Sequence, residues 1–501
     1  MVPGARTTAV DARAERWLTG GLLAAMMIAG FWPALRWGLW LDETFTAWQV
    51  DAGWRAILSE KLANPGQSAL FAYLEAPFYF PHTPFMELGL RIPAVAGALL
   101  SCFFLHRLAE VLVGEGTGFL AVTAFVASPE LINYATQARP YTLALAACLA
   151  SLVTLLRWLE TRARRDGLLL SLSLALIVHL HFLYALFLPV LGFAFWQRAR
   201  RGSSVGWREL APWVGLAGLL LLPLFPLASN FPRRSANLSD LSRSPLPDVS
   251  LMLAVLTPRQ FLISLVALVI LLLRSPRRGL EALRRSGAGP LGGLLAFWLL
   301  APPLALGAIS HLVGQSVVVG RYFFYTVPAQ CLLVALLFRG FPSRLAQMAL
   351  LACFGPIAIV NFLQTHAIAD GADSWRVPMR AIAATDPTGA APVLLESGHP
   401  MSNAMDWRGG IASGSFLYSQ LSPYPLPNQL YPLPYALDDA AQSYVRSLAD
   451  GEVAGAPLVF FAGIRGLPIE KWVRAFFESR GYTCRDVVRQ GLVLVAMRRP
   501  P

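Results

Sequence analysis

The chain has 501 residues, of which 55% are hydrophobic and only 14% charged, a composition that excludes a large soluble protein and predicts a polytopic membrane protein. The formal net charge of +12 comes almost wholly from arginine, since Lys61 and Lys471 are the only lysines. The arginines fall in short loops between apolar runs, where they set membrane topology, so this charge does not indicate nucleic-acid binding. The five cysteines are an odd number without metal-ligand spacing, and we infer neither a disulfide framework nor a metal cluster.

The first apolar run, Trp17 to Leu41, is long enough to be a first transmembrane helix or signal anchor, and no small-residue cleavage site follows it. Asp42 and Glu43 come directly after this run. A carboxylate just outside a membrane-spanning helix can serve as a base or a metal ligand at the membrane surface. The loop 42–87 that they open is long and amphipathic, and it predicts short helices lying along the interface.

Further along the chain, apolar runs of sufficient length recur and predict nine full membrane spans. They lie near 17–41, 88–113, 117–135, 140–159, 209–229, 251–273, 290–312, 322–338 and 344–363. Clusters of arginine near 6–16, 157–165, 198–208, 274–285 and 339–344 mark the cytoplasmic side.

The segment 167–197 has arginine clusters on both flanks and must cross the membrane an even number of times. Two helices of about 14 residues reach only about 21 Å each, short of the roughly 30 Å hydrocarbon core. We therefore predict a pair of short helices that turn near His179 to His181 and are buried among other helices. The count becomes about 11 helices, with a cytoplasmic N-terminus and with Asp42, Glu43 and everything after about residue 365 outside.

The composition after about residue 371 changes to that of a soluble domain, so we divide the chain into a transmembrane part, 1–368, and a small extracytoplasmic α/β domain, 369–501. Pro392 to Glu396 and Leu458 to Ala462 are predicted to be buried strands. A helix is predicted at 468–480 and a hairpin at 482–498. The proline- and tyrosine-rich segment 422–435 predicts an extended loop. The sequence contains no glycine-rich nucleotide loop, which argues against a cytosolic nucleotide-sugar site.

Several short motifs occur in an order that is typical of one family. They are Asp42-Glu43, Asn64-Pro65-Gly66, the run Tyr134-Ala135-Thr136-Gln137-Ala138-Arg139-Pro140-Tyr141, His181, Arg321-Tyr322 and Asp373-Ser374-Trp375-Arg376. In this order and spacing the whole chain resembles the GT-C membrane glycosyltransferases. The nearest branch is the bacterial relatives of protein O-mannosyltransferases and of lipid A aminoarabinose transferases.

The resemblance implies transfer of a hexose or pentose from a polyprenyl-phosphate carrier to an acceptor hydroxyl on the outer face of the bacterial cytoplasmic membrane. By position, it makes Asp42 the catalytic carboxylate. The chain departs from the family at Asn64-Pro65-Gly66, where relatives often have His-Pro-Pro or Lys-Pro-Pro, and at Gln137, where they have Glu. If those side chains bind metal or donor in relatives, that role is altered here.

The chemistry also follows from the residues themselves. A positioned carboxylate that removes the proton of an acceptor hydroxyl is the simplest catalyst of a single inverting displacement. We assign this role to Asp42, with Glu43 beside it. The leaving lipid phosphate needs cationic or dipolar partners in a water-poor site. The candidates for binding this phosphate are Arg139, Arg321, Lys61 and His181. The candidates for other substrate contacts are Asn64, Gln137, Tyr141, Tyr322, Arg233 and Arg234, the last two because they break the positive-inside pattern.

Two other classes of protein are alternatives. A transporter or flippase of lipid-linked sugars would also need many spans, but transporters usually show inverted halves with binding groups at the midplane. A structural assembly subunit would leave Asp42 and Arg139 without a task. The sequence identifies neither the sugar nor the acceptor, which can be a lipid, a polysaccharide or a protein. It predicts no resident cofactor and leaves dependence on a divalent metal open.

Overall fold

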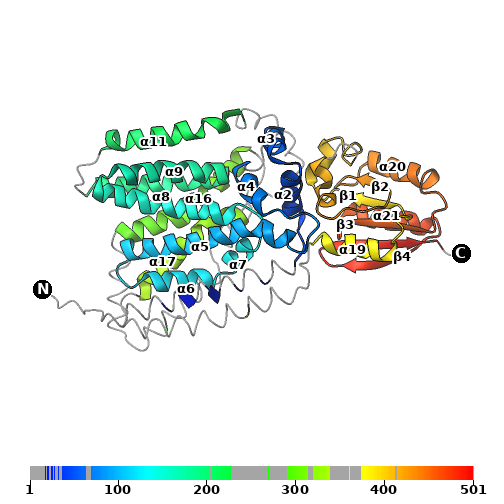
Figure 1. Ribbon diagram of the computed structural model, residues 1–501, viewed down its shortest axis with the longest axis horizontal. Coiled ribbons are helices and arrows are strands. Elements are labelled where there is room, and N and C mark those ends of the chain that lie inside the picture. The colour runs from blue at the N-terminus through cyan, green and yellow to red at the C-terminus, as the bar shows by residue number, and fades with distance from the viewer. Residues whose placement is uncertain are drawn as a thin grey trace.

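The computed structural model describes residues 37–63, 69–201, 206–226, 290–313, 320–338, 374–411 and 415–499, together with isolated positions elsewhere. A bundle of helices forms one end of the molecule and a small domain with a β-sheet forms the other, with the helices of the first loop between them (Figure 1). The predicted combination of an α-helical membrane part with a C-terminal α/β domain is confirmed. The boundary predicted at residues 368 and 369 lies outside the described residues.

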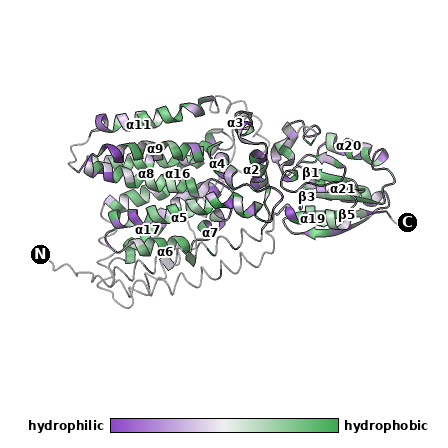
Figure 2. Ribbon diagram, in the orientation of Figure 1, coloured by the Kyte–Doolittle hydropathy of each residue, from purple (hydrophilic) through white to green (hydrophobic). Residues whose placement is uncertain are grey.

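Five helical stretches among the described residues are long and apolar enough to cross a membrane. Hydrophobic residues dominate them (Figure 2). They are α5 (Met86–Leu112), α8 (Tyr141–Thr161), the continuous pair η2 and α10 (Phe182–Ala199), Pro290–Leu312 within α16 (Pro290–Val313), and the continuous pair η5 and α17 (Gly320–Phe338). The apolar runs predicted at 88–113, 140–159, 290–312 and 322–338 correspond to four of these stretches.

The run predicted as one span at 117–135 is instead two short helices, α6 (Gly118–Val126) and α7 (Pro129–Ala135). The cause is local, because Pro129 lacks an N–H for a continuing helix and Ser128 caps a new one by accepting a hydrogen bond from the Leu131 N–H. In place of the run at 209–229, α11 (Trp207–Leu221) is followed by the short helix η3 (Leu222–Leu224). The runs predicted at 251–273 and 344–363, and most of 17–41, lie outside the described residues.

The predicted pair of helices around His181 is present. The first, α9 (Arg164–Leu180), ends where the backbone of His181 becomes extended, and η2 (Phe182–Phe187) with α10 (Leu188–Ala199) follows. The helices are longer than expected because α9 begins within the flanking arginine cluster and α10 continues to the next one.

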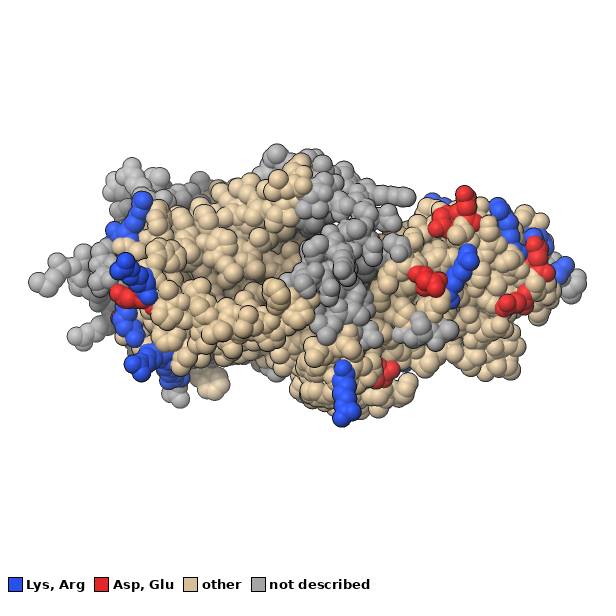
Figure 3. Space-filling view, turned by 90° about the horizontal axis from the view of Figure 1, so that it is seen from above, with Lys and Arg blue, Asp and Glu red and all other residues tan. Residues whose placement is uncertain are grey.

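The described charges of the bundle are gathered at its two ends. Figure 3 shows basic side chains at the end far from the sheet domain, and an uncharged band across the visible described surface between that end and the first-loop helices. The basic end is where α8 ends and α9 begins and where α10 ends, at Arg157, Arg162, Arg164, Arg165, Arg198, Arg200 and Arg201. A hydrocarbon environment requires an uncharged surface band of this kind.

The loop 42–87 forms the short helices that its amphipathic pattern predicts. They are α2 (Leu41–Asp51), α3 (Trp54–Ala63), α4 (Ala69–Glu75) and the 3₁₀ turn η1 (Ala76–Phe78). Acidic residues in the first turn favour the start of α2, since the N–H groups there carry partial positive charge. The α2 helix lies between the bundle and the sheet domain (Figure 1).

The C-terminal domain contains a five-stranded sheet in the order β2-β1-β3-β5-β4. The strands are β1 (Val393–Glu396), β2 (Leu430–Leu433), β3 (Leu458–Ile464), β4 (Thr483–Arg489) and β5 (Leu492–Arg498). Strand β1 is parallel to β2 and β3, whereas β5 is antiparallel to β3 and β4. The predicted strands and hairpin are present, but the segment predicted as an extended loop contains the edge strand β2.

The alternation of side chains along the strands gives the sheet two apolar faces. On one face, Leu394 packs with α20 (Asp439–Asp450) and α21 (Pro468–Ser479). On the other, Leu395 packs with α19 (Arg376–Thr385) and with the short helix η7 (Phe416–Leu421). Phe45 of α2 belongs to this second core.

The contact between the two parts of the molecule is polar as well as apolar. The hydroxyl of Tyr424 accepts a hydrogen bond from the Leu39 N–H at 2.7 Å and donates one to Glu87 Oε1 at 3.1 Å. Arg376 forms an ion pair with the same Glu87 at 3.2 Å. Along α2, the Thr44 hydroxyl lies 3.0 Å from that of Ser419. The sheet domain is therefore fixed to the start of α2 and to the start of α5.

Candidate active site

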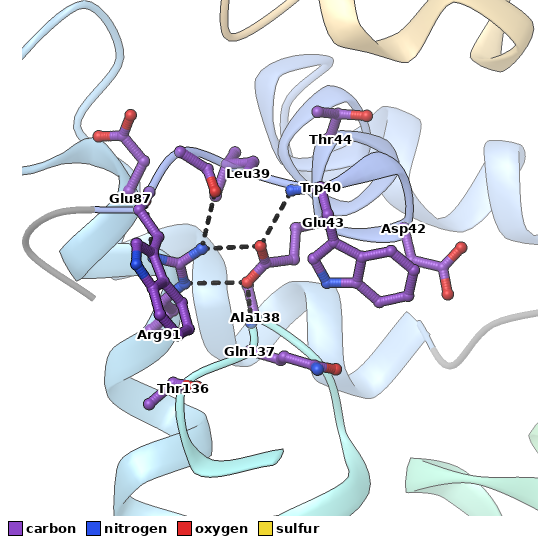
Figure 4. A network of polar contacts seen from close by, with 12 residues as sticks. Leu39, Trp40, Asp42, Glu43, Thr44, Glu87, Arg91, Thr136, Gln137 and Ala138 are labelled. Carbon is purple, nitrogen blue, oxygen red and sulfur yellow. Dashed lines mark hydrogen bonds and ion pairs between the residues drawn. The ribbon is translucent and has the colours of Figure 1, made fainter. Parts of the chain in front are cut away.

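Glu43 is fully buried and is the centre of a hydrogen-bond network (Figure 4). Its carboxylate accepts two hydrogen bonds from Arg91, Nε to Oε1 at 2.9 Å and Nη2 to Oε2 at 2.7 Å. The backbone N–H of Ala138 donates to Oε1 at 2.7 Å and that of Trp40 to Oε2 at 3.2 Å. Because every oxygen of Glu43 accepts two hydrogen bonds, its geometry favours a role in holding α2, α5 and the loop before α8 together.

The guanidinium of Arg91 is equally occupied. Besides Glu43, it donates to the carbonyl oxygens of Trp37 at 2.9 Å and Gly38 at 3.2 Å, so it also fixes the chain that enters α2. Sequence reasoning did not select Arg91. The available signal was an arginine near the start of the apolar run 88–113, since a charge within a membrane segment requires a partner.

Asp42 points away from this network, although it is the neighbour of Glu43 (Figure 4). Its carboxylate lies 3.7 Å from Arg139 Nη2 and 3.4 Å from Arg321 Nη1. The side chain of Asp42 keeps 22% of its surface exposed, whereas that of Arg139 keeps 8%. Arg139 is held in place by a hydrogen bond from Nη1 to the backbone oxygen of Asp42 at 3.2 Å. Three residues predicted from separate parts of the sequence are thus brought together.

The two arginines come from the starts of two helices. Arg139 precedes α8 and Arg321 lies in η5, at the end of the bundle that faces the sheet domain. Arg321 Nε is buried and has no hydrogen-bond partner in the part of the chain that the structure describes. The site therefore holds two positive charges and an unused donor beside one partly exposed carboxylate, an arrangement suited to an anion placed next to a base.

Aromatic rings enclose the bundle side of the site. His181 packs with the rings of Tyr141, Tyr184 and Tyr322, at centroid distances of 5.5, 5.1 and 5.6 Å. Its Nδ1 is buried and has no hydrogen-bond partner in the described part of the chain. The guanidinium of Arg321 lies 5.5 Å from the ring of Tyr322. Of the residues predicted to bind donor or substrate, His181, Tyr141 and Tyr322 therefore lie beside the arginines of the site.

The other predicted site residues either make contacts elsewhere or are not fully described. Gln137 is half-buried on the loop before α8, and its amide donates to Asn133 Oδ1 at 3.0 Å. Lys61 lies in α3, but its side chain is not described, and Asn64, Arg233 and Arg234 lie outside the described residues. In the described ranges no three His, Cys, Asp or Glu side chains gather as they would to hold a metal ion.

Comparison with known proteins supports the same fold. Residues 83–229 match the family model of the dolichyl-phosphate-mannose-protein mannosyltransferases. The chain is similar to the crystal structure of ArnT from Cupriavidus metallidurans in the apo state, with 12% identity and a TM-score of 0.55 over 97% of this chain and 98% of that one. It is also similar to that ArnT bound to undecaprenyl phosphate, with 12% identity and a TM-score of 0.57 over 95% and 97%. No curated protein matches the chain by sequence. The predicted GT-C fold is thereby confirmed.

The buried pair of Glu43 and Arg91 yields a prediction about stability. Replacing one member of a buried ion pair leaves the other charge uncompensated, so Glu43→Gln should lower the free energy of unfolding by about 3 to 5 kcal/mol. Glu160→Gln is the control, because Glu160 and Arg198 form an exposed pair at 3.5 Å, and the loss there should stay below about 1 kcal/mol. Thermal unfolding of both variants in one detergent would compare them, and equal transitions would remove Glu43 from this role.

Proposed function

We propose that this chain, which has the GT-C fold, is a membrane glycosyltransferase that moves a sugar from a polyprenyl-phosphate donor to a hydroxyl of an acceptor. The observation that carries the proposal is the partly exposed Asp42 carboxylate beside two arginines at one end of the bundle. A transporter would need its charged groups near the midplane, whereas these gather at the end that faces the sheet domain. The sugar can be a hexose or a pentose, and the acceptor a lipid, a polysaccharide or a protein.

Arg139 and Arg321 are suited to bind the donor phosphate. Charge-assisted hydrogen bonds to phosphate are about twice as strong as neutral ones, and the Arg321 Nε donor has no partner among the described residues. His181 lies close behind, with its Nδ1 unused. The uncharged band on the visible described surface of the bundle offers the surroundings that a polyprenyl chain requires (Figure 3). The similar ArnT structure contains undecaprenyl phosphate, which agrees with a donor of this class.

In the proposed reaction, the acceptor oxygen attacks the anomeric carbon of the donor sugar on the face opposite the phosphate. The bond between this carbon and the phosphate oxygen breaks, and its electron pair leaves with the lipid phosphate, where the arginines stabilise the negative charge. The proton of the acceptor hydroxyl passes to Asp42. One displacement of this kind inverts the configuration of the sugar. In this scheme Glu43 orients its neighbour and takes no proton.

The proposed setting is a bacterial cytoplasmic membrane, with the catalytic end on the outer face. The arginines at the far ends of α8, α9 and α10 support this orientation, because basic residues are retained on the cytoplasmic side. The α2 helix and the C-terminal domain would then meet a lipid-linked donor outside the cell.

The function is tested by replacing the proposed base. Asp42→Asn keeps the shape of the side chain but cannot accept a proton, so transfer should fall about 10²- to 10⁴-fold while expression and thermal stability stay close to wild type. Mass spectrometry of envelope glycolipids, polysaccharides and proteins in a deletion strain that carries either form would measure the difference. Products at wild-type levels with Asp42→Asn would exclude this residue as the base, and the flippase alternative would gain.

The assignment of the phosphate site is tested by binding. Arg139→Ala and Arg321→Ala should each lower the affinity for undecaprenyl phosphate by about 10- to 150-fold, since a hydrogen bond to a charged group contributes about 1.5 to 3 kcal/mol. Arg198→Ala is the control, because Arg198 pairs with Glu160 at the end of α8, whereas Arg139 precedes the start of that helix. Titration of purified protein in lipid nanodiscs would measure the affinity, and unchanged binding in both site variants would contradict the assignment.

The proposed orientation is tested by labelling. In a background in which the five native cysteines are replaced, we expect Ser479→Cys to react with an impermeant thiol reagent on intact spheroplasts. Ala163→Cys should react only after lysis. Both positions are exposed near helix ends, Ser479 in the sheet domain and Ala163 at the basic end of the bundle, so reactivity reports the side of the membrane. The reverse pattern would place the sheet domain in the cytoplasm.

A further inference from the structure

The turn after β1 brings the sheet domain against the catalytic helix. Glu396 Oε1 accepts a hydrogen bond from the Gly398 N–H at 2.8 Å, and the Ser397 hydroxyl accepts one from the His399 N–H at 3.1 Å. Gly398 has a positive φ of 73°, and a Cβ there would lie 3.0 Å from Leu41 Cδ1. Only glycine combines this conformation with so close an approach. The turn therefore rests on the first residue of α2.

His399 follows directly and lies beside the face of α2 that carries Asp42. Its ring packs against Phe45 and Phe416, at centroid distances of 6.3 and 5.5 Å. Phe45 is one turn of helix beyond Asp42, so the two share a face. His399 is only 8% exposed, and its Nε2 has no hydrogen-bond partner among the described residues.

The protonation of His399 defines what Nε2 can bind. Burial lowers the pKa of this imidazole to about 4, although Asp42 and a hydrogen bond with the backbone of Phe416 oppose the shift. The ring is therefore neutral at neutral pH. A neutral imidazole carries one N–H, so Nε2 can either accept or donate a hydrogen bond, according to the tautomer.

A second unused polar group lies on the same face of α2. Gln49 is seven residues, or two turns, beyond Asp42. It is 0% exposed, and neither its Oε1 nor its Nε2 has a hydrogen-bond partner within the described ranges. An unsatisfied buried polar group costs about 1 to 3 kcal/mol. A fully buried amide with neither atom hydrogen-bonded therefore lowers the stability of the ligand-free protein. Three unused polar atoms, on His399 and Gln49, thus lie along the face of α2 that carries Asp42.

We propose that His399 and Gln49 bind hydroxyl groups of a carbohydrate acceptor whose reacting hydroxyl is presented to Asp42. The inference rests on the proposed function and makes it more specific. A sugar ring carries several hydroxyls that each donate and accept, which is what His399 Nε2 and both atoms of the Gln49 amide require. A serine or threonine side chain has one hydroxyl, and that one is consumed in the reaction. The C-terminal domain would thereby supply part of the acceptor site.

The experiment uses the whole protein in lipid nanodiscs and a panel of methyl glycosides as probes, with the amides of acetyl-serine and acetyl-threonine as the alternative. At least one methyl glycoside should raise the thermal transition of the wild type, and the two amino-acid derivatives should not. Gln49→Met and His399→Phe should each lower the affinity for that glycoside by about tenfold, as expected for the loss of about 1.4 kcal/mol of binding free energy. Their affinity for undecaprenyl phosphate should stay unchanged.

Stability without ligand separates binding from a structural role. Gln49→Met replaces an unsatisfied amide by an apolar chain of similar length, so the thermal transition of the free protein should stay constant or rise. A large fall would assign Gln49 to structure and overturn the proposal. Stabilisation by the amino-acid derivatives instead of the glycosides, or no stabilisation by any glycoside, would also overturn it. Failure of the wild type to bind undecaprenyl phosphate would instead count against the proposed function.

Discussion

The buried ion pair between Glu43 and Arg91 is the interaction on which the position of the site depends. It connects the entry to α2, the start of α5 and the loop before α8 through hydrogen bonds of 2.7 to 3.2 Å. A buried pair of this kind stabilises little by itself, because removing two charges from water offsets much of their attraction. Its value lies in geometry. With Glu43 fixed, Asp42 is turned toward Arg139 and Arg321 instead of toward the interior.

The adjacent acidic residues Asp42 and Glu43 therefore have opposite surroundings. Glu43 is enclosed and accepts four hydrogen bonds from the protein, while Asp42 retains exposed surface and only loose contacts with the arginines. The difference follows from their positions on a helix, where successive residues point about 100° apart. One carboxylate is used to build the site, and the other is left for the substrate.

Much of the fold and part of the site could be predicted from the sequence, because short stretches of residues determine those features. Apolar length predicts α5, α8 and α16, and alternation with turn residues predicts the hairpin of β4 and β5. Asp42, Arg139 and Arg321 could be selected because each lies at the boundary of an apolar run. Their meeting could not be predicted, since it depends on packing between distant helices. His399 gives no local signal, because its importance comes from a turn that meets α2 only in the folded chain.

The contact between α2 and the sheet domain also constrains how the protein is made. The hydrogen bond between the Leu39 N–H and the Tyr424 hydroxyl joins residues 385 positions apart, and Phe45 completes a core whose strands begin at Val393. During synthesis, the ribosome releases the N-terminal partner long before the C-terminal one exists. The apolar ring of Phe45 therefore lacks its packing partners until the C-terminal domain has been synthesised. Contacts between residues so distant in sequence also form slowly. In a chain truncated before the last strands, the first loop would therefore be unable to complete its packing, in addition to the loss of the C-terminal domain.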